Sequence, residues 1–178
     1  MLPGPAADID ALSAQVALAS AISGKSNVVL METSDPDAMS DALYAANASD
    51  PVESPVRPMG TRRQITRQAA RALHPDTDHL PLPDGAPYGA VLVDTDACTL
   101  CLSCVSLCPS GALGDNPDLP QLRFQEDACL QCGLCANICP EDAITFAPRL
   151  NLTDAALRQD ILNEEEPFAF PFFFPLKL

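Results

Sequence analysis

The alternation of apolar and polar positions near the start of the chain predicts two helices and one short strand. Apolar residues recur on one helical face over residues 8–23, and Gly24 follows as the stop, which predicts a helix. The uniformly apolar run 28–31 predicts a buried strand. A capping residue and a first-turn proline within 34–36 then predict a helix over 37–46.

A third helix is predicted over residues 61–73, because this segment opens with a capping box and ends before a His-Pro pair. Arg63, Arg67 and Arg71 recur at every fourth position along it, so their side chains form one basic stripe. Such a stripe is most often a solvated helix face, and a docking face is the alternative.

These elements divide the chain into four segments. Residues 1–74 form an α-β-α segment of α/β type whose single strand lacks neighbours, so we expect an accessory or partner-binding unit that belongs to something larger. Residues 75–87 are a proline-rich linker, and 88–150 contain every cysteine. Residues 151–178 combine a short helix over 153–163 with a tail rich in phenylalanine and proline. The abrupt composition of that tail favours a non-native end over a docking or membrane-surface segment.

The charge of the chain bears on its partners and its location. The formal net charge of −14 argues against a nucleic-acid partner and favours basic docking faces on proteins, although solubility alone accounts for it equally well. No apolar run reaches the length of about 18 residues that a membrane span needs. The first residues lack the features of a signal peptide, so we expect a cytoplasmic protein.

An internal repeat carries the chemistry of this sequence. All eight cysteines fall in two copies of the motif C-x2-C-x2-C-x3-C-P, and every cysteine of the first copy recurs at one constant offset in the second. The copies contribute Cys98, Cys101, Cys104 and Cys108, and then Cys129, Cys132, Cys135 and Cys139. The repeat predicts two equivalent half-domains packed on each other. Gly133 of the second copy is matched by Leu102 of the first, so we expect the two loops to differ in backbone conformation.

The spacing of the cysteines favours iron–sulfur clusters over structural zinc and over disulfides. A loop with three cysteines at this short, regular spacing can curl around one cubane and bring three thiolates to it. The fourth cysteine points away from its own loop. Structural zinc uses two separated ligand pairs, which would leave the third closely spaced cysteine without a role. Disulfides are expected in an oxidising compartment, which the start of the chain does not indicate.

On these motifs, residues 88–150 resemble the bacterial ferredoxins with two [4Fe–4S] clusters. The likeness extends to the separation of the two motifs and to strand-like flanks at 88–94, 121–125 and 143–147. It implies an α+β fold of two half-domains related by a pseudo-twofold axis, here a module of a larger ferredoxin-like redox protein. It also implies crossed ligation. One cluster would be held by Cys98, Cys101, Cys104 and Cys139, and the other by Cys129, Cys132, Cys135 and Cys108.

Electron transfer is the function that this resemblance implies. We expect a carrier of single electrons between redox protein partners, either a ferredoxin or the relay subunit of an oxidoreductase complex. The sequence shows no nucleophile–base motif and no dinucleotide fingerprint, so we expect no catalytic site of its own. The alternative is a structural or regulatory iron–sulfur module that binds proteins.

Overall fold

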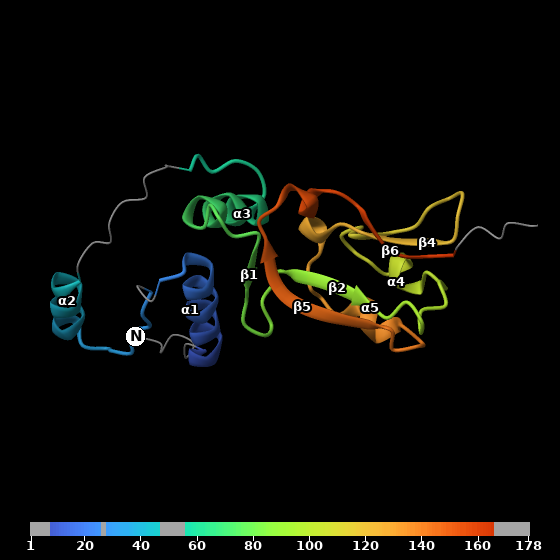
Figure 1. The fold of residues 1–178 in the computed structure, drawn as a ribbon. Helices are drawn as coiled ribbons and strands as arrows, with labels where there is room; N and C mark the ends of the chain where they lie inside the picture. Colours follow the sequence, from blue (N-terminus) through green and yellow to red (C-terminus); the bar gives the residue numbers. More distant parts are fainter. Residues whose placement is uncertain (1–7, 26–27, 47–55, 166–178) are drawn as a thin grey trace, which may run out of the picture.

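Strand pairing builds two small antiparallel sheets around the cysteine repeat. The structure is a computed structural model that describes residues 8–25, 28–46 and 56–165 (Figure 1). The first sheet has the order β1-β5-β2 and consists of β1 (His79–Pro81), β5 (Ile144–Asn151) and β2 (Gly89–Val93). The second sheet has the order β3-β4-β6 and consists of β3 (Leu113–Gly114), β4 (Gln121–Phe124) and β6 (Asp160–Glu164). The mixture of helices with these sheets fits the predicted α+β class.

A shared apolar core holds the two sheets and the cysteine loops together. Val91 of β2 and Leu122 of β4 are 2% and 1% exposed, and Phe124 and Ile144 are buried beside them. Side chains of the cysteine loops pack against this core. Two short helices follow the loops, α4 (Ser103–Ser106) and α5 (Leu134–Ile138), and they contact each other. Two 3-10 turns, η1 (Glu126–Ala128) and η2 (Asp154–Leu157), complete this part of the chain.

The predicted linker 75–87 is part of the folded structure. Its strand β1 pairs with the end of β5, and Leu80 and Leu82 are buried. They form a second apolar cluster with Ala70, which is fully buried, and with residues at and after the end of β5. A high proline content indicates a linker but does not distinguish an edge strand from a free loop, because an edge strand tolerates proline.

The helices predicted near the start of the chain are confirmed. They are α1 (Ile9–Ser23), α2 (Pro36–Ala45) and α3 (Arg62–Leu73), with Asp8, Asp35 and Thr61 as their N-caps. Helix α1 packs on α3 and β1 through Leu18, Ala21 and Ile22. Helix α2 lies apart from the other elements, and all its residues are exposed (Figure 1).

The strand predicted at 28–31 is wrong. This segment takes no regular structure, and Val29 is 79% exposed. A short apolar run becomes a strand only where it finds an edge to pair with, and none of the described strands pairs with it.

The helix predicted at 153–163 is also wrong. The turn η2 is followed by β6, which pairs with β4 and contributes Leu162 to the core. A run this short carries no decisive periodicity, so its pairing partner determines its conformation. Two strands of the sheets, β1 and β6, therefore lie outside the predicted 88–150 segment. The phenylalanine-rich tail lies outside the described residues, within which no helix has the length and apolarity to cross a bilayer.

Candidate functional site

The two cysteine loops share the same unusual backbone conformation. Leu100 and Leu102 have φ of 53° and 57°, and Gln131 and Gly133, at the matching positions of the second motif, have φ of 52° and 79°. The expectation that the loops differ at Leu102 and Gly133 is therefore wrong. A left-handed conformation costs a residue with a side chain about 1–2 kcal/mol, which the surrounding structure has to offset.

The first loop forms one wall of a cavity that we call cavity 1. Its lining includes three cysteines of the first motif and the last cysteine of the second motif, which are Cys98, Cys101, Cys104 and Cys139. Most of the remaining lining is apolar, from Leu100, Leu102, Leu122 and Ile144, and Glu141 also lines the cavity.

The second loop forms a matching cavity 2. Its lining includes three cysteines of the second motif and the last cysteine of the first, which are Cys129, Cys132, Cys135 and Cys108. Val91, Leu113 and Phe146 contribute apolar surface, and Gln131 and Ser110 contribute polar groups.

The exchange of the fourth cysteine between the cavities follows from the packing of α4 and α5. Each helix begins just before the third cysteine of its motif, Cys104 or Cys135. The fourth cysteine, Cys108 or Cys139, follows the end of the helix. Because α4 and α5 contact each other, each helix delivers its last cysteine to the cavity of the other loop. The cavities thus gather the cysteines that the resemblance assigns to each cluster, and the ligation itself stays a prediction.

The donor set of each cavity fits a [4Fe–4S] cluster. Such clusters are held by four cysteine thiolates, and each cavity offers four thiols in a largely apolar lining. All eight cysteines are described and none forms a disulfide. Among the described residues, no three His, Cys, Asp or Glu side chains lie close enough together to hold a single metal ion.

Comparison with known families identifies the chemistry of this segment. Residues 97–144 match the family model described as a 4Fe-4S dicluster domain. This segment is a 4Fe-4S ferredoxin-like module. The match begins just before Cys98 and ends just after Cys139, so it spans both motifs. No curated protein matches the chain.

The thiols of this 4Fe-4S module differ in how readily they lose a proton. Burial raises the pKa of the Cys104 and Cys129 thiols, and it raises that of Cys135 to about 11. A thiol must be deprotonated to bind iron, so these three must release protons when a cluster is assembled.

Hydrogen bonds act in the other direction on two further thiols. The backbone and hydroxyl of Ser103 lower the pKa of the exposed Cys101 thiol. Burial tends to raise the pKa of Cys108, but hydrogen bonds from the Leu113 N–H, at 3.4 Å from the sulfur, and from Ser110 outweigh it, so this pKa is lowered. Both thiols are therefore held closer to the thiolate form that a cluster requires.

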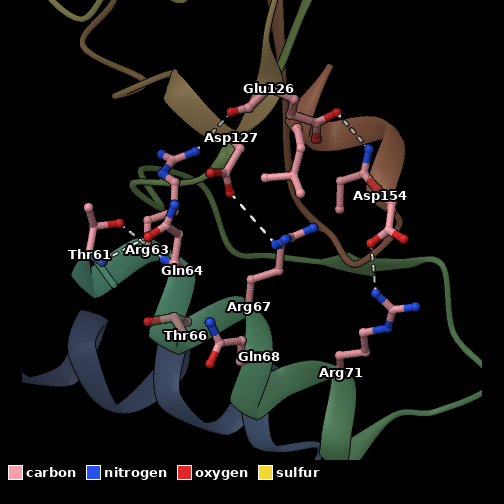
Figure 2. A network of polar contacts seen from close by, with 12 residues as sticks. Thr61, Arg63, Gln64, Thr66, Arg67, Gln68, Arg71, Glu126, Asp127 and Asp154 are labelled. Atoms are coloured by element: carbon pink, nitrogen blue, oxygen red, sulfur yellow. Dashed lines mark hydrogen bonds and ion pairs between the residues drawn. The ribbon is translucent and has the colours of Figure 1, made fainter. Parts of the chain in front are cut away.

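The arginine stripe of α3 packs against the segment before Cys129 and against η2. The interpretation as a solvated face is therefore wrong for Arg63 and Arg67, whereas Arg71 is exposed. Figure 2 shows Arg63, Arg67 and Arg71 reaching from α3 toward the segment before Cys129 and toward η2. Arg67 donates to the Thr153 carbonyl at 3.1 Å and lies 3.8 Å from Asp127, with both side chains nearly buried. Arg71 pairs with Asp154 at 2.9 Å, but both side chains are more than half exposed. Arg67 therefore contributes more than Arg71 to the stability of the docked helix.

Arg63 makes the most extensive contacts of the three arginines. Its guanidinium donates to the carbonyl oxygens of Pro87 at 2.6 Å, Glu126 at 2.9 Å and Cys129. It also lies over the ring of Tyr88, with 4.8 Å from Cζ to the ring centroid. Burial lowers the pKa of Arg63, but a guanidinium remains protonated in proteins. A fixed positive charge is therefore held beside the first cysteine of the second motif.

Glu126 links the second loop to the first sheet. Its carboxylate accepts two bonds from Arg149, at 2.9 and 2.8 Å, and one from Asn151 at 3.0 Å. Burial tends to raise the pKa of Glu126, but these bonds outweigh it and hold the pKa below its usual range. Neither Glu126 nor Gln131 stands out in the sequence, whereas the regular spacing of the arginines did signal a docking face as one alternative.

Proposed function

We propose that this chain is an electron-transfer protein that holds two [4Fe–4S] clusters in its dicluster module. One cluster would be bound by Cys98, Cys101, Cys104 and Cys139, and the other by Cys129, Cys132, Cys135 and Cys108. The grouping of four thiols in each of two cavities is the observation that carries this proposal. Each cluster, when bound, supplies a site that takes up and releases one electron.

Repetition within the module supports a pseudo-twofold arrangement of two half-domains. The left-handed residues recur at the same offset as the cysteines, and so do the starts of α4 and α5. In this arrangement the two fourth cysteines cross between the halves, so each cavity depends on both motifs. The two halves would then assemble together, because neither cavity is complete without a cysteine from the other half.

The residues around the cavities have the roles expected of a carrier. Leucine, isoleucine and phenylalanine side chains shield the thiols from water, and burial of this kind is one of the main determinants of reduction potential. Backbone N–H groups of Leu113 and Gln131 donate to the sulfurs of Cys108 and Cys129, each at 3.4 Å, and favour the more negative, reduced state. The proposal assigns no catalytic residue to this chain.

We expect the chain to act among redox proteins of the cytoplasm, where free cysteines are available to bind iron. Its partners would be an electron donor and an electron acceptor, both proteins, and it acts as a free ferredoxin or as the relay subunit of an oxidoreductase complex. Isolation of the native chain with its neighbours distinguishes these two forms, because a relay subunit co-purifies with a subunit that carries the catalytic centre.

The proposal is tested by counting iron and sulfide in protein purified without oxygen. We expect about eight iron and eight acid-labile sulfide per chain, since two cubanes contain that number, and a brown colour that bleaches with dithionite. Stoichiometric zinc without sulfide would contradict the proposal. Clusters that form but resist reversible reduction would favour a structural or regulatory role instead.

Crossed ligation is tested with two serine variants. Cys139→Ser should damage the cluster bound with Cys98, and Cys108→Ser should damage the one bound with Cys129, because each fourth cysteine lines the cavity of the other loop. Paramagnetic NMR of the cysteine β-protons identifies which cluster changes, and Ser106→Ala, in an exposed residue of α4, is the control. Damage confined to the cluster of the same motif would refute the crossing.

A further inference from the structure

The two cavities are built alike, but their polar surroundings differ at matched positions. Cys98 and Cys129 are each the first cysteine of a motif and are therefore equivalent. The Cys98 carbonyl accepts a hydrogen bond from the neutral amide of Asn163, at 3.3 Å. The Cys129 carbonyl accepts one from the cationic guanidinium of Arg63. Cavity 2 therefore has a positive charge at a place where cavity 1 has an uncharged amide.

A second difference concerns the sulfur of Cys129. The side-chain amide of Gln131 donates to this sulfur at 3.3 Å, in addition to the Gln131 backbone N–H at 3.4 Å. The residue that corresponds to Gln131 in the first loop is Leu100, which has no polar side chain to donate. Both residues have nearly the same φ, 52° and 53°, so the loops differ here in side-chain chemistry and not in backbone path.

A third difference lies just beyond the fourth cysteines. Cavity 1 is lined by Glu141, and the corresponding residue in the lining of cavity 2 is Ser110. A carboxylate disfavours added negative charge, whereas the Ser110 hydroxyl lies 3.7 Å from the Cys108 sulfur and can donate to it. Glu141 is exposed, so solvent screens its effect.

Other structural features fix Arg63 and Gln131 in place. Arg63 donates to three carbonyl oxygens and stacks on Tyr88, so it cannot turn away without losing all of these contacts. Gln131 packs against Gly89 of β2, where an added Cβ would lie 2.9 Å from the Gln131 side chain. Both groups are therefore preorganised before an electron arrives and need little rearrangement when the charge changes.

We infer that Arg63 and Gln131 tune the reduction potential and raise it at cavity 2 above that at cavity 1. An electron shared between the two clusters then resides mainly at cavity 2. The inference rests on the proposed function, since it requires both clusters. Reduction adds one negative charge, and a nearby cation and N–H···S donors favour the reduced state. Transfer between the clusters moves one electron out of one cluster and into the other, so it needs no further oxidant or reductant.

This assignment gives the N-terminal part of the chain a defined role. Arg63 belongs to α3, which lies outside residues 97–144, the part that matches the dicluster family model. The docked helix thus supplies the charge that makes the two halves of the repeat electrically unequal. The two similar cavities would therefore differ in reduction potential. An electron would move from cavity 1, at the lower potential, to cavity 2, at the higher potential.

The inference is tested on the full chain with both clusters present, by redox titration followed with EPR and with paramagnetic NMR of the cysteine β-protons. Wild-type protein should be reduced first at cavity 2. In Arg63→Gln the ratio of reduced to oxidised cluster at cavity 2 should fall about tenfold at a fixed potential, a shift of about 59 mV for a one-electron couple. Arg63→Lys should recover much of this shift, and cavity 1 should change little.

Matched variants separate charge from packing. Asn163→Ala removes the equivalent carbonyl bond at Cys98 without changing a charge, so it should shift the potential less than Arg63→Gln. Arg71→Gln removes a charge from the same helix, but from an exposed pair, and should leave both potentials unchanged. Exchange of the loop residues gives an independent test, in which Gln131→Leu lowers the potential at cavity 2 and Leu100→Gln raises that at cavity 1.

Two results would overturn the inference. The first is a full complement of iron and sulfide together with reduction that begins at cavity 1. The second is unchanged potentials in both Arg63→Gln and Gln131→Leu. If Arg63→Gln assembles no cluster, the pair Gln131→Leu and Leu100→Gln alone decides. Either result leaves the proposed function intact, whereas wild-type protein that assembles no reducible clusters would overturn both.

Discussion

Replacing Glu126 with glutamine tests whether the partly buried ion pair between Glu126 and Arg149 stabilises the fold. The Glu126 carboxylate accepts three hydrogen bonds, two from Arg149 and one from Asn151, and its side chain is 11% exposed. A glutamine amide keeps one acceptor oxygen but points a donor at the guanidinium. Loss of a bond to a charged group costs about 1.5–3 kcal/mol. The Arg149 side chain is 34% exposed and can turn to water, so we expect a net loss near the lower end of that range.

The assay is thermal unfolding of the protein with its clusters, without oxygen, followed by circular dichroism. For a chain of this size the loss corresponds to a midpoint lower by about 3–6 °C. The exposed Glu32 provides the matched control, since Glu32→Gln makes the same chemical change away from the pair. A Glu126→Gln variant as stable as the wild type would refute the reasoning.

The pH dependence of this difference gives a second criterion. Because the pKa of Glu126 is lowered in the folded protein, the stabilisation is complete above the pKa of the unfolded chain and is lost as pH falls through the lower folded value. The difference between wild type and Glu126→Gln should therefore stay constant from about pH 8 to pH 5.5 and shrink only below the ordinary glutamate pKa of about 4.3. A difference that disappears within the neutral range would contradict the lowered pKa.

Three further predictions follow from the packing of the module. Leu122→Ala, in a residue 1% exposed that also lines cavity 1, should lower the free energy of unfolding by about 2–5 kcal/mol in denaturant titrations and should reduce cluster content. Gly89→Ala should weaken the first sheet, because its Cβ would lie 2.7 Å from the Ala147 carbonyl oxygen, and should displace Gln131, whose side chain would lie 2.9 Å from that Cβ; a lower potential at cavity 2 would report the displacement. Residues 88–150 expressed alone should retain less iron than residues 56–165, since the shorter piece lacks α3, β1 and β6, and equal iron content would show these elements to be dispensable.

The cysteine motifs and the helix caps were predictable because their signals are local. Eight cysteines in a regular repeat specify a loop geometry, and the capping box at Thr61 specifies where α3 begins. The structure brings together in each cavity the four cysteines that were grouped on resemblance alone. The motifs and the caps depend on residues near one another in the chain, so the sequence contains this information directly, whereas the exchange of the fourth cysteines came from the resemblance.

The arginine spacing indicated a docking face as one alternative, but the groups that α3 contacts could not be predicted, because Arg63 binds carbonyl oxygens of Pro87, Glu126 and Cys129. Every residue has a carbonyl, so the sequence carries no sign of which ones converge on a distant arginine. The strand β6 was missed for a related reason, since its conformation depends on pairing with β4, which lies far earlier in the chain. Leu102 shows the limit of local rules, because tertiary packing holds it in a conformation that favours glycine.

The presence of two redox-active clusters is tested most directly by counting the electrons that one chain accepts. Protein purified without oxygen is titrated with a low-potential one-electron reductant while EPR follows the paramagnetic centres. Two [4Fe–4S] clusters should take up about two electrons per chain, and the fully reduced sample should show magnetic interaction between two neighbouring spins. Uptake of about one electron, or of none, by protein with its full iron content would contradict a role as a two-cluster carrier.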